Sequence, residues 1–404
     1  MTIHQNLTKI VFISALGYFV DVFDLFLFSV TRIQSLKDLG IPADQLMTIG
    51  SSILNYQMAG LLLGGFIWGL AGDYFGRVRV LYLSIFLYSL FTFLNGFVQS
   101  VEQYQWCRFF AGFGLAGELG AAITLVAEVS SAKKRGIATT WIGALGFLGG
   151  ITAGATAKFL SWRYCFEIGG LLGFILLAFR LQVKESYLFL EYKQKARQQK
   201  FFTALKILFA NKYLSKMYFS FVLIGCPIWF VAGILIAFAP EFAQSIGVVG
   251  KVIPADSVLI SYIGVILGDV SCGLLSQKLR SRKKALLVFL GITLLGIPIY
   301  FSCSGFDDSV FLFVCFLVGI GTGYWAVLLT FAAESFPTAV RATVSTSVPN
   351  LIRASVVIML VALEKLKFFY DLKQAAIIIA IFVFILAFGA LWQTKETFGQ
   401  ELHD

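Results

Sequence analysis

The chain is 404 residues long, 58% hydrophobic and only 13% charged. Soluble domains carry about 25% charged residues, so this composition excludes an ordinary soluble protein and is typical of a membrane protein. The formal net charge of +10 would suit a nucleic-acid-binding protein, but no basic stretch lies on a soluble domain that could present it to a nucleic acid.

Apolar runs follow one another along the whole chain, separated by short polar segments. Each run is long enough to cross a bilayer core as a helix, which takes about 20 residues. The twelve runs are 9–31, 46–70, 79–99, 104–128, 137–159, 163–181, 213–238, 255–279, 285–303, 309–332, 341–364 and 371–393. The sequence therefore predicts an all-α membrane protein with twelve transmembrane helices.

One longer polar segment, 182–212, divides these runs six and six. It is basic, rich in Gln and free of Gly and Pro, which favours amphipathic helices beside the membrane. We expect a six-helix bundle over 1–181, a cytoplasmic linker over 182–212 and a second six-helix bundle over 213–404.

The positions of Lys and Arg predict the orientation. With the N-terminus inside, Arg180 and the basic clusters at 133–135, 193–200 and 278–284 all face the cytoplasm, where membrane proteins carry their excess of positive charge. We therefore expect a multi-pass protein of the cell (inner) membrane with both termini cytoplasmic. The same asymmetry accounts for the net positive charge.

Two short patterns occur once in each half of the chain. Glu128 and Arg135 lie seven apart after one apolar run, and Glu334 and Arg341 lie seven apart after another. The polar segments 69–79 and 273–283 also align with each other. A duplicated apolar chain of this kind indicates a transporter built from two parallel repeats.

Charges inside the apolar runs are the informative residues, because a charge at the bilayer centre costs about 3 kcal/mol or more. Six such residues occur: Asp21, Asp24, Arg108, Glu118, Asp269 and Arg353. Such residues are expected to line a water-filled cavity or to pair. Helix direction places Asp24 and Arg108 at similar depth, where they could pair, either for function or as a purely structural ion pair.

Catalytic chemistry has few candidates. The two His residues, His4 and His403, are terminal, the Cys residues are scattered without a C-x-x-C pattern, and no P-loop motif occurs. We expect neither an enzyme nor a metal site nor a bound cofactor. Any proton carried through the membrane must use Asp or Glu.

The segment from Gly69 to Arg79 resembles the loop motif G-x-x-x-D-x-x-G-R-x-[RK] of the major facilitator superfamily. The segment from Arg108 to Gly114 resembles that superfamily's helix 4 motif. The resemblance implies two six-helix bundles and a conformational gate at the cytoplasmic loops, formed by Asp73, Gly76, Arg77, Arg79, Glu128, Arg135, Glu334 and Arg341. A solvated loop is the alternative interpretation of Asp73 and Arg77.

Three further segments resemble the sialate and monocarboxylate proton symporters of this superfamily. They are the helix 1 segment around Asp21 and Asp24, the sequence Gly-Glu118-Leu-Gly in helix 4, and Glu334-Ser-Phe-Pro-Thr-Ala-Val-Arg341-Ala-Thr followed by Asn350 and Arg353. Phosphate symporters carry Lys at the last position. A guanidinium at 353 favours a carboxylate, which it can bind through two parallel hydrogen bonds.

These considerations assign provisional roles. Arg353, with Asn350 and Arg108, is the expected anion-binding group; the alternative interpretation is that Arg353 neutralises Asp269 or binds a helix carbonyl. Asp24, Glu118 and Asp21, with Arg108 beside them, are the expected proton-coupling residues. The partners are a small-molecule substrate, protons and the lipid bilayer, and the expected functional unit is a monomer.

The predicted function is proton-coupled symport of a small organic anion by alternating access. A uniporter or symporter for sugars or other uncharged solutes would keep the fold without needing protonatable carboxylates. Phosphate, amino-acid or organic-cation carriers of the same fold are further alternatives. A receptor or membrane enzyme would need a sensing domain or a catalytic constellation that the sequence lacks.

Overall fold

The computed structural model describes residues 7–75, 77–118, 132–180 and 203–399. Within these ranges the chain is almost entirely helical, and the only strand-like pairing is an isolated bridge between Val249 and Asp307. Ten helices of this part are long and apolar enough to cross a membrane, and a further apolar helix over Arg79–Asn95 is shorter. The all-α membrane fold predicted from the apolar runs is confirmed.

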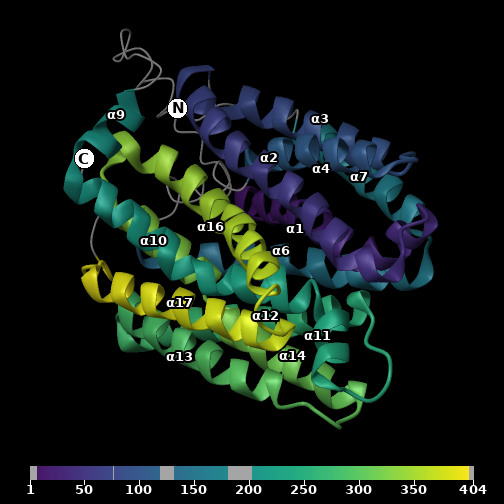
Figure 1. Cartoon of the computed structure of the whole chain (residues 1–404). Helices are drawn as coiled ribbons and strands as arrows, with labels where there is room; N and C mark the ends of the chain where they lie inside the picture. Colours follow the sequence, from purple (N-terminus) through teal and green to yellow (C-terminus); the bar gives the residue numbers. More distant parts are fainter. Residues whose placement is uncertain (1–6, 76, 119–131, 181–202, 400–404) are drawn as a thin grey trace.

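Residues 7–180, here called the N half, form the purple to blue group of helices in Figure 1. Its elements are α1 (Leu7–Asp38), the short 3-10 helix η1 (Ala43–Gln45), α2 (Leu46–Phe75), α3 (Arg77–Asn95), α4 (Val101–Leu115), α6 (Ala132–Phe159) and α7 (Trp162–Arg180).

Residues 203–399, here called the C half, form the teal to yellow group in Figure 1. Its elements are α9 (Thr203–Ala210), α10 (Lys212–Phe230), the π-helical segment η2 (Val231–Ile236), α11 (Ala239–Ile246), α12 (Pro254–Leu279), α13 (Arg282–Phe301), α14 (Asp308–Thr322), α15 (Trp325–Ser335), α16 (Thr338–Leu366) and α17 (Leu372–Gln393). Only α9 falls in the predicted linker, whose residues 182–202 lie outside the described part.

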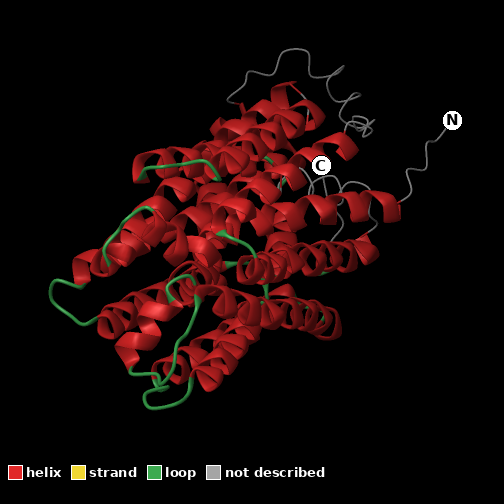
Figure 2. Cartoon of the chain, turned by 90° about the vertical axis from the view of Figure 1, so that its right-hand side faces the viewer, coloured by secondary structure: helices red, strands yellow, loops and turns green. Residues whose placement is uncertain are grey.

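The helices run back and forth, so the bundle has two ends (Figure 2). We call one the far end; it holds the connections 39–45, 96–100, 160–161, 247–253, 302–307 and 367–371. Backbone hydrogen bonds join some of these connections, as where Val249 donates to Phe306 at 2.8 Å. The near end holds the short turns 280–281 and 336–337 and the segment 394–399.

Several helices begin where a polar side chain satisfies free backbone N–H groups. The Ser100 hydroxyl accepts from Gln103 N at the start of α4, and the Asn211 side chain accepts from the second and third residues of α10. Asp371 forms a full capping box with Gln374 at the start of α17. Such caps stabilise a helix by about 1 kcal/mol each.

The apolar run 309–332, predicted as one helix, is two helices in the structure. The chain breaks at Gly323 and Tyr324, between α14 and α15. A Cβ atom on Gly323 would lie 2.4 Å from the backbone N of Asp269 and 2.5 Å from the Gly268 backbone. The break therefore lets the backbone of α12 lie in direct contact with Gly323. It also leaves backbone N–H groups at the start of α15 without partners inside the helix.

The halves meet along two long helix pairs. In the pair α6 and α12, Gly150 packs against Tyr262 and Gly154 packs against Leu259. In the pair α2 and α16, Gly65 packs against the Asn350 side chain. Small residues at such contacts let helix backbones approach closely. In both pairs the glycines named belong to the N half.

Candidate functional site: a charged cavity between the halves

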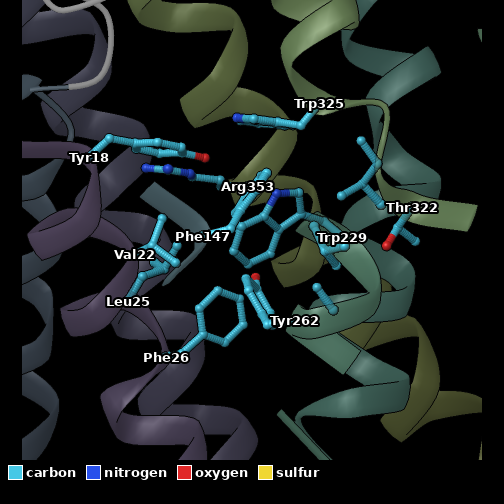
Figure 3. Close-up of a pocket in the computed structure, with 13 residues that line it drawn as sticks. Tyr18, Val22, Leu25, Phe26, Phe147, Trp229, Tyr262, Thr322, Trp325 and Arg353 are labelled. Atoms are coloured by element: carbon cyan, nitrogen blue, oxygen red, sulfur yellow. The ribbon is translucent and has the colours of Figure 1, made fainter. Parts of the chain in front are cut away.

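A small cavity lies between the halves, halfway along the spanning helices (Figure 3). Its volume is about 30 Å³, which is room for one or two water molecules. A substrate of several carbon atoms can enter only when the halves move. Among described residues its lining is mostly apolar, with one cationic side chain: Tyr18, Val22, Leu25, Phe26, Phe147, Ile228, Trp229, Ala232, Tyr262, Val265, Thr322, Trp325 and Arg353.

Irregular backbone shapes the C-half wall of this cavity. Pro227 lies inside α10, and four residues later the helix widens into the π-helical segment η2. Proline cannot donate a backbone hydrogen bond, and π-helical turns are frequent at functional sites. Trp229 and Ala232, which face the cavity, lie in and beside this widened stretch.

An ion pair joins the two halves at the cavity. The Nη2 atom of Arg353, on α16, donates to Oδ2 of Asp21, on α1, at 2.9 Å. Both side chains are at most 1% exposed. Arg353 therefore pairs with Asp21, whereas the sequence had suggested Asp269 or a helix carbonyl as its alternative partner.

The pair leaves several polar atoms without a hydrogen-bond partner in the described part of the chain. They are Nε and Nη1 of Arg353, Oδ1 of Asp21 and Nε1 of Trp325. An unpaired buried polar group costs about 1–3 kcal/mol, and more when it is charged. The cavity wall thus holds unused donors next to a guanidinium, which is the arrangement that an entering carboxylate would satisfy.

Asp24 and Arg108 lie close together, as helix direction predicted. Arg108 Nη1 and Asp24 Oδ1 are 3.4 Å apart, and the Thr92 hydroxyl donates to the same oxygen at 2.6 Å. Arg108 Nε also donates to the side-chain Oδ1 of Asn95 at 3.0 Å, and the guanidinium lies over the Phe166 ring. The whole cluster belongs to the N half, so Arg108 holds Asp24 rather than facing the cavity between the halves.

Glu118 pairs with Arg180, a residue that the sequence had placed among the cytoplasmic charges. Arg180 Nη2 donates to Glu118 Oε1 at 2.9 Å, and both side chains are buried. Gly17 of α1 lies directly against the pair, since a Cβ atom there would be 2.0 Å from the glutamate oxygen. The sequence pointed to this pair only through Glu118 itself, an acid inside an apolar run with no cation near it along the chain.

Asp269 has a backbone partner. Its Oδ1 accepts the N–H of Ala326 at 2.9 Å, at the buried start of α15 beyond the Gly323 break. Its Oδ2 has no hydrogen-bond partner among the described residues and faces Gly143 of the N half. Asp269 therefore lies at the contact between the halves, and in the described part of the chain it forms no ion pair.

Asn350 also reaches across the interface. Its Nδ2 donates to the carbonyl oxygen of Ala116 in the N half at 2.9 Å and to Thr346 O within α16 at the same distance. Its Oδ1 has no partner in the described part. Asn350 thus closes the halves together one helical turn from Arg353, and it does not line the cavity.

The sequence pattern of the Major Facilitator Superfamily matches residues 14–360. The chain belongs to this superfamily. It is 26% identical over 405 residues to a putative metabolite transport protein of Haemophilus influenzae, covering 96% of each chain. It is 31% identical over 350 residues to the cis,cis-muconate transport protein of Acinetobacter baylyi, covering 83% of this chain and 82% of that one.

Solved structures show the same fold. The proton:xylose symporter XylE matches with a TM-score of 0.75 at 16% identity, over 98% of this chain and 97% of that chain. The protein is therefore a multi-pass transporter of the Major Facilitator Superfamily with its twelve-helix fold, and not an enzyme.

The expected gate at the near end is only partly within the described residues. Gly76 and Glu128 lie outside them, and the side chains of Asp73, Arg77 and Arg135 are likewise not described. Arg79 is exposed.

The C-half part of this gate is described in full. Glu334 accepts from Arg282 at 3.2 Å and from the Thr397 hydroxyl at 2.9 Å. Arg341 donates to the carbonyl oxygens of Ala333 and Phe336. These contacts tie the near ends of α13, α15 and α16 to the segment after α17.

A second bridge between the halves lies at the far end, where the sequence analysis found no candidate. Arg32 of α1 forms two contacts with the Glu241 carboxylate of α11, at 2.6 and 2.9 Å, and its guanidinium lies over the Phe238 ring. It also donates to the carbonyl oxygens of Leu46 and Ala237. Arg32 is fully buried and the Glu241 side chain is 19% exposed, so this bridge is largely shielded from water.

Proposed function

We propose that this transporter is a proton-coupled symporter of a small organic anion that works by alternating access. The Arg353–Asp21 pair carries the proposal, because it is a buried cation and a buried acid held by opposite halves at the one described cavity. The transport function of the cis,cis-muconate relative, which carries an organic acid, supports the same substrate class.

Charge balance explains how proton and anion would move together. In the empty transporter, the negative Asp21 neutralises the positive Arg353. A proton on Asp21 releases Arg353, whose charge a substrate carboxylate then neutralises. Binding a proton alone leaves a buried charge of +1, and binding an anion alone leaves −1, and either is costly in a dry membrane protein interior. The empty and doubly loaded forms are neutral and can change conformation.

Asp24 and Glu118 are proposed to pass the proton on rather than to exchange it with substrate. Each already has a cation within its own half, at Arg108 and Arg180 respectively. Asp24 lies three residues after Asp21, on the same helix face. Glu118 lies closer to the near end. Asp24 is on α1, and Glu118 packs against α1 at Gly17. The two acids thus lie on either side of Asp21 along this helix.

We further propose that the near end faces the cytoplasm of the cell (inner) membrane. The excess of Lys and Arg at this end supports that orientation. The far end, bridged by Arg32 and Glu241, is then closed to the outside. Since one chain contains the whole cavity, we propose that the functional unit is a monomer.

Purified protein in proteoliposomes tests the mechanism. Radiolabelled monocarboxylates are offered under an imposed pH gradient and, separately, in exchange for unlabelled substrate without a gradient. We expect Asp21→Asn to abolish accumulation driven by the gradient and to keep at least part of the exchange. We expect Arg353→Ala to abolish both, and Arg353→Lys to lose most anion affinity because the paired hydrogen bonds are lost.

Controls change one aspartate and one basic residue away from the cavity. Asp44→Asn and Lys278→Ala remove exposed charges at the far and near ends and should transport normally. Full substrate affinity in folded Arg353→Ala protein would refute the anion site. Gradient-driven accumulation with unchanged pH dependence in Asp21→Asn would refute Asp21 as the exchanging acid.

Orientation is tested separately by single-cysteine labelling in a cysteine-free background. A membrane-impermeant reagent added to intact cells should label position 251, in the far-end connection, but not position 278, at the near end. Both residues are exposed lysines. The opposite labelling pattern would reverse the proposed orientation.

A further inference from the structure

We propose that the transported anion is a planar, unsaturated monocarboxylate, such as a benzoate-like acid, whose carboxylate is held jointly by Arg353 and the indole N–H of Trp325. This inference rests on the proposed anion symport and specifies its substrate. It is argued from the unused donors, from the ring arrangement and from the charges around the cavity.

The donors converge on one side of the cavity. Trp325 Nε1 is buried without a partner in the described part of the chain, as are Nε and Nη1 of Arg353. The guanidinium carbon lies 5.9 Å from the centre of the Trp325 ring. Figure 3 shows the indole nitrogen directed to the side where the Tyr18 hydroxyl and Arg353 lie.

A carboxylate matches these donors in number and charge. Its two oxygens can accept two parallel hydrogen bonds from a guanidinium edge, and a lone pair remains for the indole N–H. A neutral amide of the same shape offers one acceptor oxygen and adds N–H donors that would face other donors. The donor set therefore selects the ionised acid over its amide.

Flat rings form the opposite wall. Phe26 and Trp229 stack with ring centres 6.0 Å apart and planes 19° apart, and Phe26 meets Tyr262 edge-on at 4.6 Å. Phe147 in turn packs on Tyr262 at 5.9 Å. Rings of this kind contact a flat conjugated molecule over its whole face, and offset or edge-to-face contacts add to what area burial alone contributes.

The charges around the cavity argue against a second carboxylate. Arg353 is the single cation in the described lining, and the nearest other ionisable groups include the acid Asp21. A second carboxylate would have to lie against ring faces, which carry negative charge density. A polyhydroxylated sugar acid would bury hydroxyl groups against Val22, Leu25 and Val265 without enough partners, and each buried hydroxyl group without a hydrogen bond weakens binding.

Ligand binding to the purified wild-type transporter tests the substrate class. Quenching of tryptophan fluorescence is measured with benzoate and nicotinate, and compared with four mismatched probes: cyclohexanecarboxylate, benzamide, cis,cis-muconate and N-acetylneuraminate. We expect each planar monocarboxylate to bind at least about 10-fold more tightly than each mismatched probe, since one such mismatch is worth 1–3 kcal/mol. Equal or tighter binding of cyclohexanecarboxylate or N-acetylneuraminate would overturn the class.

The variant Trp325→Phe tests the indole donor, because it keeps a ring and removes the N–H. We expect its benzoate affinity to fall about 10-fold, the usual loss for a hydrogen bond to a charged group, while its weak benzamide affinity and its thermal stability stay unchanged. Trp106→Phe, at an exposed position on α4, is the matched control and should bind as wild type. Unchanged benzoate affinity in Trp325→Phe would exclude the indole as a donor.

The outcomes separate this inference from the symport on which it rests. If a dicarboxylate or sugar acid is accumulated, and Arg353→Ala abolishes that accumulation, the planar class is wrong and anion symport stands. If an uncharged solute is carried equally well by wild-type and Arg353→Ala protein, both are wrong.

Discussion

Asp24 and Arg108 form a buried ion pair within the N half, whereas Arg353 of the C half reaches its acid only across the interface. Glu118, like Asp24, has its cation in the N half, whereas Asp269 of the C half, among the described residues, accepts a hydrogen bond from a backbone N–H. In the proposed mechanism, pairs within a half travel with it as a rigid body. Pairs across the interface would form and break as the halves move, so these are the pairs that can couple ligand binding to conformation.

The largest expected effect comes from breaking a pair inside the N half. Arg108→Ala leaves Asp24 buried with the Thr92 hydroxyl as its remaining partner. Removing one member of a buried ion pair typically destabilises a protein by about 3–5 kcal/mol. We expect Arg108→Ala to lower the thermal unfolding midpoint in detergent more than Arg353→Ala does, because Arg353 lines a cavity with room for water beside its partner Asp21. Equal losses would erase the distinction between the two pairs.

The next effect concerns the buried bridge at the far end. Glu241→Gln removes the charge that binds Arg32 while keeping a side chain of the same shape. Truncating one partner of a buried charged pair across an interface costs about 2–5 kcal/mol, so we expect the far end to open in a larger fraction of molecules. Spin labels at positions 44 and 251, one on each half, should report a longer distance population than in wild type.

A matched comparison uses the exposed bridge at the same end. Lys158 and Asp256 also join the halves, at 2.6 Å, but their side chains are 41% and 26% exposed. Water and salt weaken such pairs to about 0–1 kcal/mol. Asp256→Asn should therefore change the label distances little, and added salt should remove what difference there is. A shift as large as that of Glu241→Gln would show that burial does not set the strength of these bridges.

The smallest effect is expected at the near end, outside the membrane. Burial alone would raise the pKa of Glu396, but hydrogen bonds from the Ser281 hydroxyl and the N–H groups of Arg282, Phe398 and Lys283 outweigh it and lower the pKa. A lowered pKa in the folded state means that these contacts stabilise the fold above the ordinary glutamate pKa and are lost as the pH falls through the folded-state value.

Hydrogen exchange of residues 394–399 measures this effect. Exchange, corrected for its intrinsic pH dependence, should stay slow at neutral and mildly acidic pH and accelerate only in more acidic solution. Ser281→Ala should move the acceleration to higher pH, because it removes one of the hydrogen bonds that lower the pKa of Glu396. Exchange in the Ser281→Ala protein that accelerates at the wild-type pH would contradict the assignment.

Sequence patterns predicted what depends on one helix or on helix direction. Apolar length predicted the spanning helices, and alternating direction placed Asp24 at the depth of Arg108. Contacts that depend on how the halves meet could not be predicted. The pairing of Arg353 with Asp21 and that of Arg32 with Glu241 join residues more than 200 positions apart.

Two other features could not be predicted for local reasons. Arg180 ends an apolar run, and a charge in that position is indistinguishable from a cytoplasmic loop residue until Glu118 is seen beside it. The break at Gly323 lies in a run without proline, and glycine alone is common in spanning helices. Only the close approach of α12 shows why the chain separates into α14 and α15 there.

The glycines along the two interfaces have a directional consequence. A methyl group at Gly154, near the far end, would lie 2.8 Å from the Ala255 carbonyl oxygen, whereas one at Gly69, nearer the near end, would lie 3.8 Å from Thr346. The methyl group at Gly154 would clash with the other half, whereas the one at Gly69 would form an ordinary van der Waals contact. A single added carbon atom at Gly154 would therefore favour conformations in which the far end is open. The side of the membrane to which the unloaded transporter opens thus depends on the absence of side chains at such positions as much as on charge.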